Sequence, residues 1–134
     1  MKIECFLDTN VLLYAASVKE ELKRTRAIDL LDRAFGLSTQ VLQEFYVNAT
    51  RKLAIPLSPI EAIDWLDRLE KQPCVEVTMR LVRQAVVLSN RYRISYWDAA
   101  IVAAAEQLQA PILYTEDLSH GQSYGSVQVI NPFV

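Results

Sequence analysis

The sequence is poor in several residue types, and each scarcity argues against a class of protein. Only three glycines occur among 134 residues, so glycine-rich phosphate loops and collagen-like repeats are disfavoured. The single histidine, His120, cannot build a histidine-rich zinc centre or a histidine-pair acid–base system. The two cysteines, Cys5 and Cys74, form no CxxC motif, and we interpret both as small buried hydrophobic residues in a reducing compartment.

Long hydrophobic runs and an excess of positive charge are also missing. No apolar run approaches the roughly 18 to 20 residues that cross a bilayer, and the N-terminal MKIECFLD reaches an acid too early for a signal peptide. We therefore expect a cytoplasmic protein without membrane contact. The formal net charge of −2 argues against nonspecific, charge-driven binding of nucleic acid, although a local basic stripe is compatible with it.

What is present indicates an ordinary globular protein. Hydrophobic residues make up 51% of the chain and charged residues 22%, which is enough apolar material to bury a core. No linker, internal repeat or low-complexity tract divides the sequence. We expect residues 1–134 to form one domain.

Apolar runs and helical patterns alternate along the chain. Runs typical of buried strands lie at 3–7, 37–38, 74–77, 112–114 and 127–130, the last as an edge strand. Helical patterns begin near Val11 and cover 24–35, about 40–49, 58–70, 79–92 and 98–108, with the charged segment 19–23 as a loop or a frayed helix end. We expect Gly36 to end the second helix, Ser38 or Thr39 to cap the third, and Ser58 to open the fourth through a capping box. The alternation predicts an α/β fold, with a central, mainly parallel twisted β-sheet of about five short strands flanked by helices on both faces.

Four acidic residues stand where these elements begin or end. Asp8 directly follows the first strand and Asp117 follows the strand at 112–114, while Glu44 and Asp98 lie early in helices entered from the same edge. Ligands of open α/β sheets bind outside the carboxyl ends of the strands, where the strand order reverses. Carboxylates gathered there raise each other's pKa, and a hard divalent cation relieves the repulsion. The pattern predicts an Mg²⁺ or Mn²⁺ site suited to phosphodiester hydrolysis.

Each acid also has a purely structural explanation. Asp98 stands three residues after Ser95 and could complete a capping box. Glu44 could be a solvated helix residue, and Asp117 an ordinary turn residue. Asp8 has the least ordinary surroundings, because Asp-Thr-Asn after an apolar strand places three polar side chains at the functional edge of the sheet.

Five segments of the sequence together resemble a known family. The segments FLDTNVLLYA, LQEFY, YWDAAIVAAA, LYTEDLSHGQ and VINPF resemble a PIN domain (PilT N-terminus) of the VapC type. The resemblance covers essentially the whole chain and keeps the acidic motifs in the family's order. It implies a magnesium- or manganese-dependent endoribonuclease, usually the toxin of a toxin–antitoxin pair, with RNA as substrate, a cognate antitoxin as partner and a homodimer as the expected assembly.

The resemblance also implies which residues act. Those that would bind metal and catalyse are Asp8, Glu44, Asp98 and Asp117. Asn10 and Thr115 would be polar supports of these acids, and Glu116 would assist or substitute for the fourth acid.

Other residues are candidates for contact with RNA or with a second subunit. The basic pairs Arg51-Lys52 and Arg91 with Arg93 could contact RNA, although cations near helix C-termini also stabilise the helix dipole. The pair Tyr96-Trp97 could stack on a base, or else anchor its helix in the core or contact a second subunit. Trp65 could likewise contribute to a dimer or to the core.

Two functions from other classes compete with the nuclease. A catalytically inactive PIN-fold module would use its acids as caps and act through protein contact. A haloacid-dehalogenase-like phosphatase also begins with an aspartate after the first strand, but its mechanism requires a second acid two positions later. Asn10 occupies that position here, so the phosphatase is the poorer fit.

Overall fold

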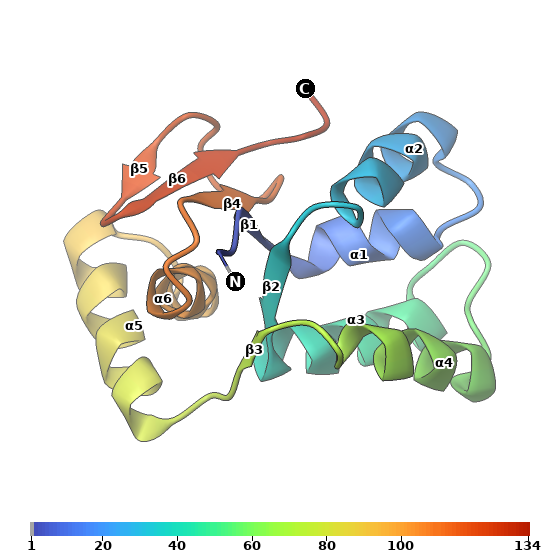
Figure 1. Ribbon diagram of the computed structural model, residues 1–134, viewed down its shortest axis with the longest axis horizontal. Helices are drawn as coiled ribbons and strands as arrows, with labels where there is room; N and C mark the ends of the chain where they lie inside the picture. Colours follow the sequence, from blue (N-terminus) through green and yellow to red (C-terminus); the bar gives the residue numbers. More distant parts are fainter. Residues whose placement is uncertain (1) are drawn as a thin grey trace.

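The strands assemble into one sheet in the order β3-β2-β1-β4-β6-β5 in a computed structural model, which describes residues 2–134 (Figure 1). Their bounds are β1 Cys5–Leu7, β2 Phe35–Ser38, β3 Cys74–Val75, β4 Ile112–Tyr114, β5 Ser123–Tyr124 and β6 Val127–Ile130. All neighbouring strands pair in parallel except β5, which runs antiparallel to β6. The predicted α/β class and mainly parallel sheet are confirmed, with six strands in place of about five.

Within residues 2–134, six helices cover the two faces of the sheet. They are α1 Thr9–Ala16, α2 Glu21–Leu30, α3 Thr39–Arg51, α4 Pro59–Leu69, α5 Met79–Tyr92 and α6 Tyr96–Gln107. Helices α1 to α4 lie on one side of the sheet, and α5 and α6 lie on the other (Figure 1). Among residues 2–134, no helix has the length and apolar character needed to cross a membrane.

The central strand β1 and helix α6 form the middle of the core. All three residues of β1 are buried, and so are the seven consecutive residues from Ala99 to Ala105. Five of those seven are alanines, whose small side chains let the helix backbone approach the sheet closely, and α6 contacts β2, β4 and β6. This packing fixes the N-terminus of α6, and with it the segment around Asp98, relative to the strands.

Several predicted element boundaries are confirmed. The capping box at the start of α4 is complete, because Ser58 Oγ accepts from the Glu61 N–H at 3.2 Å and Glu61 Oε1 accepts from the Ser58 N–H at 2.9 Å. Ser38 caps α3, and α5 spans Met79–Tyr92 as the periodicity predicts. Trp65 is half-buried with its ring centroid 5.7 Å from that of Phe45, which confirms its assignment to the core.

The prediction that Gly36 ends a helix is wrong. Helix α2 begins at Glu21, inside the charged segment expected to be a loop or a frayed helix end, and it ends at Leu30. Gly36 lies beyond this helix, within strand β2. The glycine leaves room there for Leu108, since a Cβ at this position would lie 2.5 Å from Leu108 Cδ1, the end of a flexible side chain. A glycine inside a strand was thus interpreted as the end of a helix.

The prediction that residues 127–130 form an edge strand is also wrong. Strand β6 pairs with β4 on one side and with β5 on the other, so β5 is the edge. The turn before β6 contains Gly125 with a φ of 61°. A two-residue strand such as β5 carries too little periodicity to be recognised from its sequence.

A candidate acidic active site at the carboxyl edge of the sheet

The strand order reverses between β1 and β4. From β1 the chain proceeds through β2 to β3 in one direction, and it returns to β4 on the other side of β1. The residues that follow these two strands are joined directly, because the Asp8 N–H donates to the Tyr114 carbonyl at 3.1 Å and Thr115 Oγ1 donates to Asp8 Oδ2 at 2.7 Å. The crevice in which α/β sheets bind ligands therefore opens above Asp8.

A cavity of about 230 Å³ at this edge is lined by all four predicted acids. They come from four separate segments: the end of β1, helix α3, the first turn of α6 and the loop after β4. The acids that line it are Asp8, Glu44, Asp98 and Asp117, and its other lining residues are Thr9, Asn10, Leu13, Gln40, Asn48, Trp97 and Ile101. Within residues 2–134, no group of three or more acidic, histidine or cysteine side chains is already arranged as a metal-binding cluster. The four acids thus share one cavity without meeting at a point.

Asp8 is the most buried of the acids, with 5% of its surface exposed. The pKa of its carboxyl group is raised from 3.8 to about 7, mainly by burial and to a smaller extent by the neighbouring carboxylates of Asp117 and Glu44. Two hydrogen bonds lower this pKa, one from Thr115 Oγ1 and one from the Thr9 N–H, each at 2.7 Å. The carboxylate is therefore held in a fixed orientation in surroundings that favour its neutral form.

Glu44 is half-buried on α3 and is held by two neighbours. Thr9 Oγ1 donates to Glu44 Oε1 at 2.7 Å, and Gln40 Nε2 donates to Glu44 Oε2 at 3.4 Å. The same Gln40 amide donates to the carbonyl oxygen of Trp97 at 3.3 Å, so it links α3 to the start of α6. Sequence reasoning missed Gln40, although a polar residue one helical turn before Glu44 and next to the apolar Val41 was a usable signal.

Asp98 combines two of the roles considered for it. Its N–H donates to Ser95 Oγ at 3.1 Å, which caps α6, while its half-buried side chain lines the acidic cavity. Burial raises the pKa of the Asp98 carboxyl group, and the charges of Asp117 and Glu44 raise it further, against the Ser95 hydrogen bond. The effect of Glu44 and Asp117 on its pKa reflects how near these charges lie.

Asp117 is held by the two predicted polar supports. Its N–H donates to Thr115 Oγ1 at 3.0 Å, and Asn10 Nδ2 donates to Asp117 Oδ2 at 3.1 Å and to Thr115 Oγ1 at 3.2 Å. Asn10 Oδ1 is buried and has no hydrogen-bond partner among the residues that the structure describes. Because a buried polar oxygen without a partner is costly, this atom indicates a ligand position at the site.

Glu116 is directed to a neighbouring cavity. Tyr14 Oη donates to Glu116 Oε1 at 2.8 Å, and Lys23 Nζ lies 3.5 Å from Glu116 Oε2. That cavity, of about 390 Å³, also contains Lys52 and borders the acidic one through Asn10. Of the two adjacent acids, Asp117 lines the acidic cavity and Glu116 pairs with Lys23.

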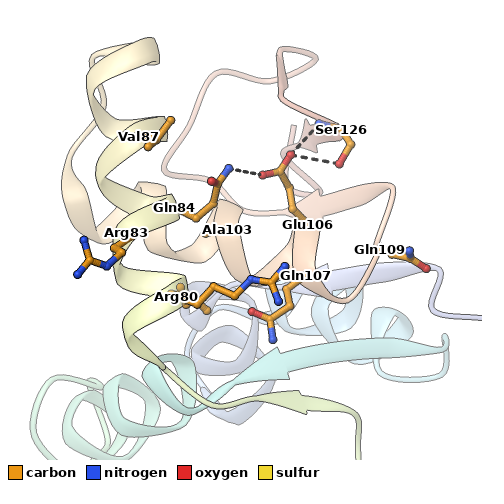
Figure 2. A pocket seen from close by; sticks show the side chains of 10 residues that line it. Arg80, Arg83, Gln84, Val87, Ala103, Glu106, Gln107, Gln109 and Ser126 are labelled. Atoms are coloured by element: carbon orange, nitrogen blue, oxygen red, sulfur yellow. Dashed lines mark hydrogen bonds between the residues drawn. The ribbon is translucent and has the colours of Figure 1, made fainter.

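A second cavity is larger than the acidic one. It has a volume of about 960 Å³ and lies between α5, α6 and the turn before β6, where Figure 2 shows its lining side chains. It contains one carboxylate, Glu106, which accepts hydrogen bonds from the Ser126 N–H at 3.1 Å, from Ser126 Oγ at 3.3 Å and from Gln84 Nε2 at 3.5 Å. Arginine and glutamine side chains supply most of the remaining polar groups, namely Arg80, Arg83, Gln84, Gln107 and Gln109.

Comparison with known proteins agrees with this fold. The family model described as PIN domain matches residues 5–122, and the chain belongs to the PIN domain family. No curated protein sequence matches the chain significantly.

Solved structures share the fold at low sequence identity. A toxin–antitoxin complex from Klebsiella pneumoniae superposes with a TM-score of 0.70 at 18% identity, covering 96% of this chain and 98% of that one. The Mycobacterium tuberculosis VapC20, a toxin that cleaves the sarcin–ricin loop, gives 0.69 at 19% identity, covering 85% and 90%. VapBC2 from Rickettsia felis, bound to a DNA fragment from its promoter, gives 0.66 at 16% identity, covering 95% and 97%.

Proposed function

We propose that this chain is a divalent-metal-dependent endoribonuclease of the VapC type and acts as the toxin of a toxin–antitoxin pair. The observation that carries the proposal is the convergence of Asp8, Glu44, Asp98 and Asp117 on one cavity at the strand-order reversal. Membership in the PIN domain family and the fold shared with VapC20, a toxin that cleaves the sarcin–ricin loop, support it. Four acids from four segments are difficult to explain as independent caps and turns.

The donor set of the cavity fits Mg²⁺ or Mn²⁺. Its ionisable lining groups are all carboxylates, with no histidine or cysteine among them, and hard divalent cations prefer such oxygen ligands. The unpartnered Asn10 Oδ1 adds a buried oxygen that a cation or its water could satisfy. Asp8, Asp98 and Asp117 would hold the ion, with Glu44 beside them. When bound, the ion stabilises charge that develops on the phosphate and lowers the pKa of water.

The protein's own contribution is to hold these groups in place. Thr115 and the Thr9 N–H fix the two oxygens of Asp8, and Asn10 fixes Asp117, so little reorganisation is needed when substrate binds. Glu44 Oε2 receives only the long 3.4 Å hydrogen bond from Gln40. This oxygen is suited to accept a proton from an attacking water.

An antitoxin, a homodimeric assembly and a cytoplasmic location complete the proposal. The antitoxin is supported by the toxin–antitoxin complex from Klebsiella pneumoniae and by the VapBC complexes of similar fold. The surplus of carboxylates in the cavity favours a partner that places a basic side chain there. Failure to co-purify with a small protein encoded next to this one would count against this part of the proposal.

The direct test is to induce the protein in cells and to sequence the RNA ends that appear, with Asp8→Asn as the control. We expect discrete new ends with the wild-type protein and none with Asp8→Asn, since the substitution keeps the shape of the side chain and removes its charge. Purified protein should cleave RNA when Mn²⁺ is added, and Mn²⁺ should raise its melting temperature because the ion binds the folded state. Cleavage by Asp8→Asn at the wild-type rate would contradict the assignment.

A further inference from the structure

The exposed indole of Trp97 is a feature that the four acids leave unexplained. Trp97 is the second residue of α6 and directly precedes Asp98. Its side chain is 65% exposed, so of the three places considered for it the core does not apply to Trp97. The side chain also lines the acidic cavity. A large aromatic surface left in water beside a candidate active site is typical of a ligand contact.

Neighbouring residues hold Trp97 in place. The ring of Tyr96 packs edge-on against the indole, with centroids 5.1 Å apart and planes at 82°. The backbone carbonyl of Trp97 accepts a hydrogen bond from the buried Gln40 amide, which also contacts Glu44. Both contacts reduce the motion of the indole before any ligand arrives, which lowers the entropy lost on binding. Trp97 is therefore suited to act as a rigid platform.

The negative charge of the cavity makes the uncharged indole of Trp97 useful for binding a nucleic acid. Four carboxylates line the cavity and repel the phosphates of a nucleic acid until a cation is bound. Stacking of a base on an aromatic ring needs no charge complementarity and increases affinity by about fivefold to a hundredfold per base. An indole at the rim can hold a nucleotide beside the acids in spite of that repulsion.

The same geometry selects the form of the nucleic acid. In an A-form duplex the bases are paired and stacked on one another, so their faces cannot stack on a protein side chain. Bases in loops, bulges and single strands can be splayed out and stacked. An indole next to the acids thus discriminates in favour of an unpaired nucleotide at the position of cleavage.

We propose that Trp97 is a substrate-binding residue that stacks on an unpaired RNA base adjacent to the phosphate that is cleaved. The proposal rests on the nuclease function proposed above and adds one contact by which the site holds its substrate.

The first test compares cleavage rates of Trp97→Ala and Trp97→Phe with those of Met79→Ala. Met79 is the matched control, because it is also 65% exposed and does not line the acidic cavity. With a short single-stranded oligoribonucleotide and Mn²⁺, we expect kcat/KM to fall about tenfold or more in Trp97→Ala. Trp97→Phe should retain most of the wild-type value and Met79→Ala all of it. The same sequence annealed into a duplex should be a poor substrate for every variant.

The second test measures stacking without cleavage. The sequence contains two tryptophans, so an Asp8→Asn, Trp65→Phe protein reports on Trp97 alone through its fluorescence. The oligoribonucleotide should quench this fluorescence. An abasic nucleotide moved along the strand should remove the quenching at one position. That same abasic position should weaken binding to protein that retains Trp97, but should cost nothing further after Trp97→Ala.

The outcomes separate this proposal from the nuclease assignment. Wild-type kcat/KM in Trp97→Ala, together with active wild-type enzyme, overturns the stacking proposal and leaves the nuclease standing. A wild-type protein that cleaves no RNA with Mn²⁺ defeats the nuclease assignment, whereas the quenching experiment still decides whether an unpaired base contacts the indole. A Trp97→Ala protein that cleaves normally but loses a co-purifying small protein assigns the indole to that partner and overturns the proposal.

Discussion

Helix α6 lines two cavities whose carboxylates have different surroundings. Asp98 in its first turn lines the small cavity of about 230 Å³, and Glu106 in its last turn lines the large one of about 960 Å³. Asp98 shares its cavity with three other acids, while Glu106 is surrounded by the neutral donors Ser126 and Gln84. The helix dipole favours a negative charge at the first position and disfavours it at the second, where hydrogen bonds compensate. If the acidic cavity is the active site, as we propose, converging charge is a better guide to function here than cavity size.

The largest contrast should appear when the same chemical change is made at the two ends of α6. We expect Asp98→Asn to lower the rate of RNA cleavage by more than about a hundredfold, since loss even of groups that only support a metal ligand costs about 10- to 100-fold. Glu106→Gln should keep the wild-type rate. Initial rates with Mn²⁺ measure both. Equal losses in the two variants would show that the acidic cavity has no special part in the reaction.

The stability of the metal-free protein should depend on pH through Asp8. The pKa of this carboxyl group is raised from 3.8 to about 7, so the native state favours the protonated form. Its stabilising contribution is complete below about pH 4 and is lost as the pH rises through about 7, a change of roughly 4 kcal/mol for a shift of about three pKa units. Urea unfolding in EDTA across this range measures it.

Two variants sharpen this pH prediction. Asp8→Asn should remove most of the loss, because an amide does not titrate, and should be more stable than wild type at pH 8. Glu106→Gln should leave the loss unchanged. If wild type and Asp8→Asn lose stability in parallel, Asp8 is not the group that titrates.

The supporting hydroxyls of the two cavities should also differ in importance. Thr115 Oγ1 joins Asp8, Asn10 and Asp117, so Thr115→Val should reduce the cleavage rate and the affinity for Mn²⁺ by about 10- to 100-fold. Ser126→Ala removes one hydrogen bond to Glu106 and should change neither. Calorimetric titration with Mn²⁺ and initial rates give both quantities, and unchanged Mn²⁺ affinity in Thr115→Val would contradict the role given to its hydroxyl.

The smallest effect should come from the turn beside the large cavity. Gly125 has a φ of 61°, and a Cβ there would collide with Glu106 Oε2, so Gly125→Ala should destabilise the fold by about 1–2 kcal/mol. Gly121→Ala is the control, because Gly121 has a φ of 85° but no atom within 4 Å of the added Cβ. Urea midpoints should rank Gly125→Ala below Gly121→Ala, with cleavage rates unchanged in both. A reversed order would mean that the contact with Glu106 does not limit this turn.

The sequence predicts best those elements whose signals are local. Helix α5 and the capping box of Ser58 and Glu61 were predictable, because helical periodicity and capping depend on residues within one or two turns. Gly36 was misinterpreted because it packs against Leu108, which lies 72 positions away in the chain. The same limit applies to β5, whose place at the edge is set by its pairing with β6.

The same distinction between local signals and long-range contacts applies to the candidate site. The four acids could be proposed from their positions after strands and at helix starts, and the structure places them around one cavity. Whether they bind metal and catalyse stays a prediction. The hydrogen bond from Gln40 to the Trp97 carbonyl could not be foreseen, since it depends on how α3 meets α6 across 57 positions of sequence.

The hydrogen bond from Thr115 to Asp8 joins residues 107 positions apart, so the site can be completed only late in synthesis. Asp8 emerges with the first segment, but the groups that hold it arrive only when strand β4 and the residues after it have been synthesised. A nascent chain, or one truncated before residue 115, lacks both Thr115 and Asp117. If the acids are the catalytic groups, the site is incomplete until about nine-tenths of the chain has been translated.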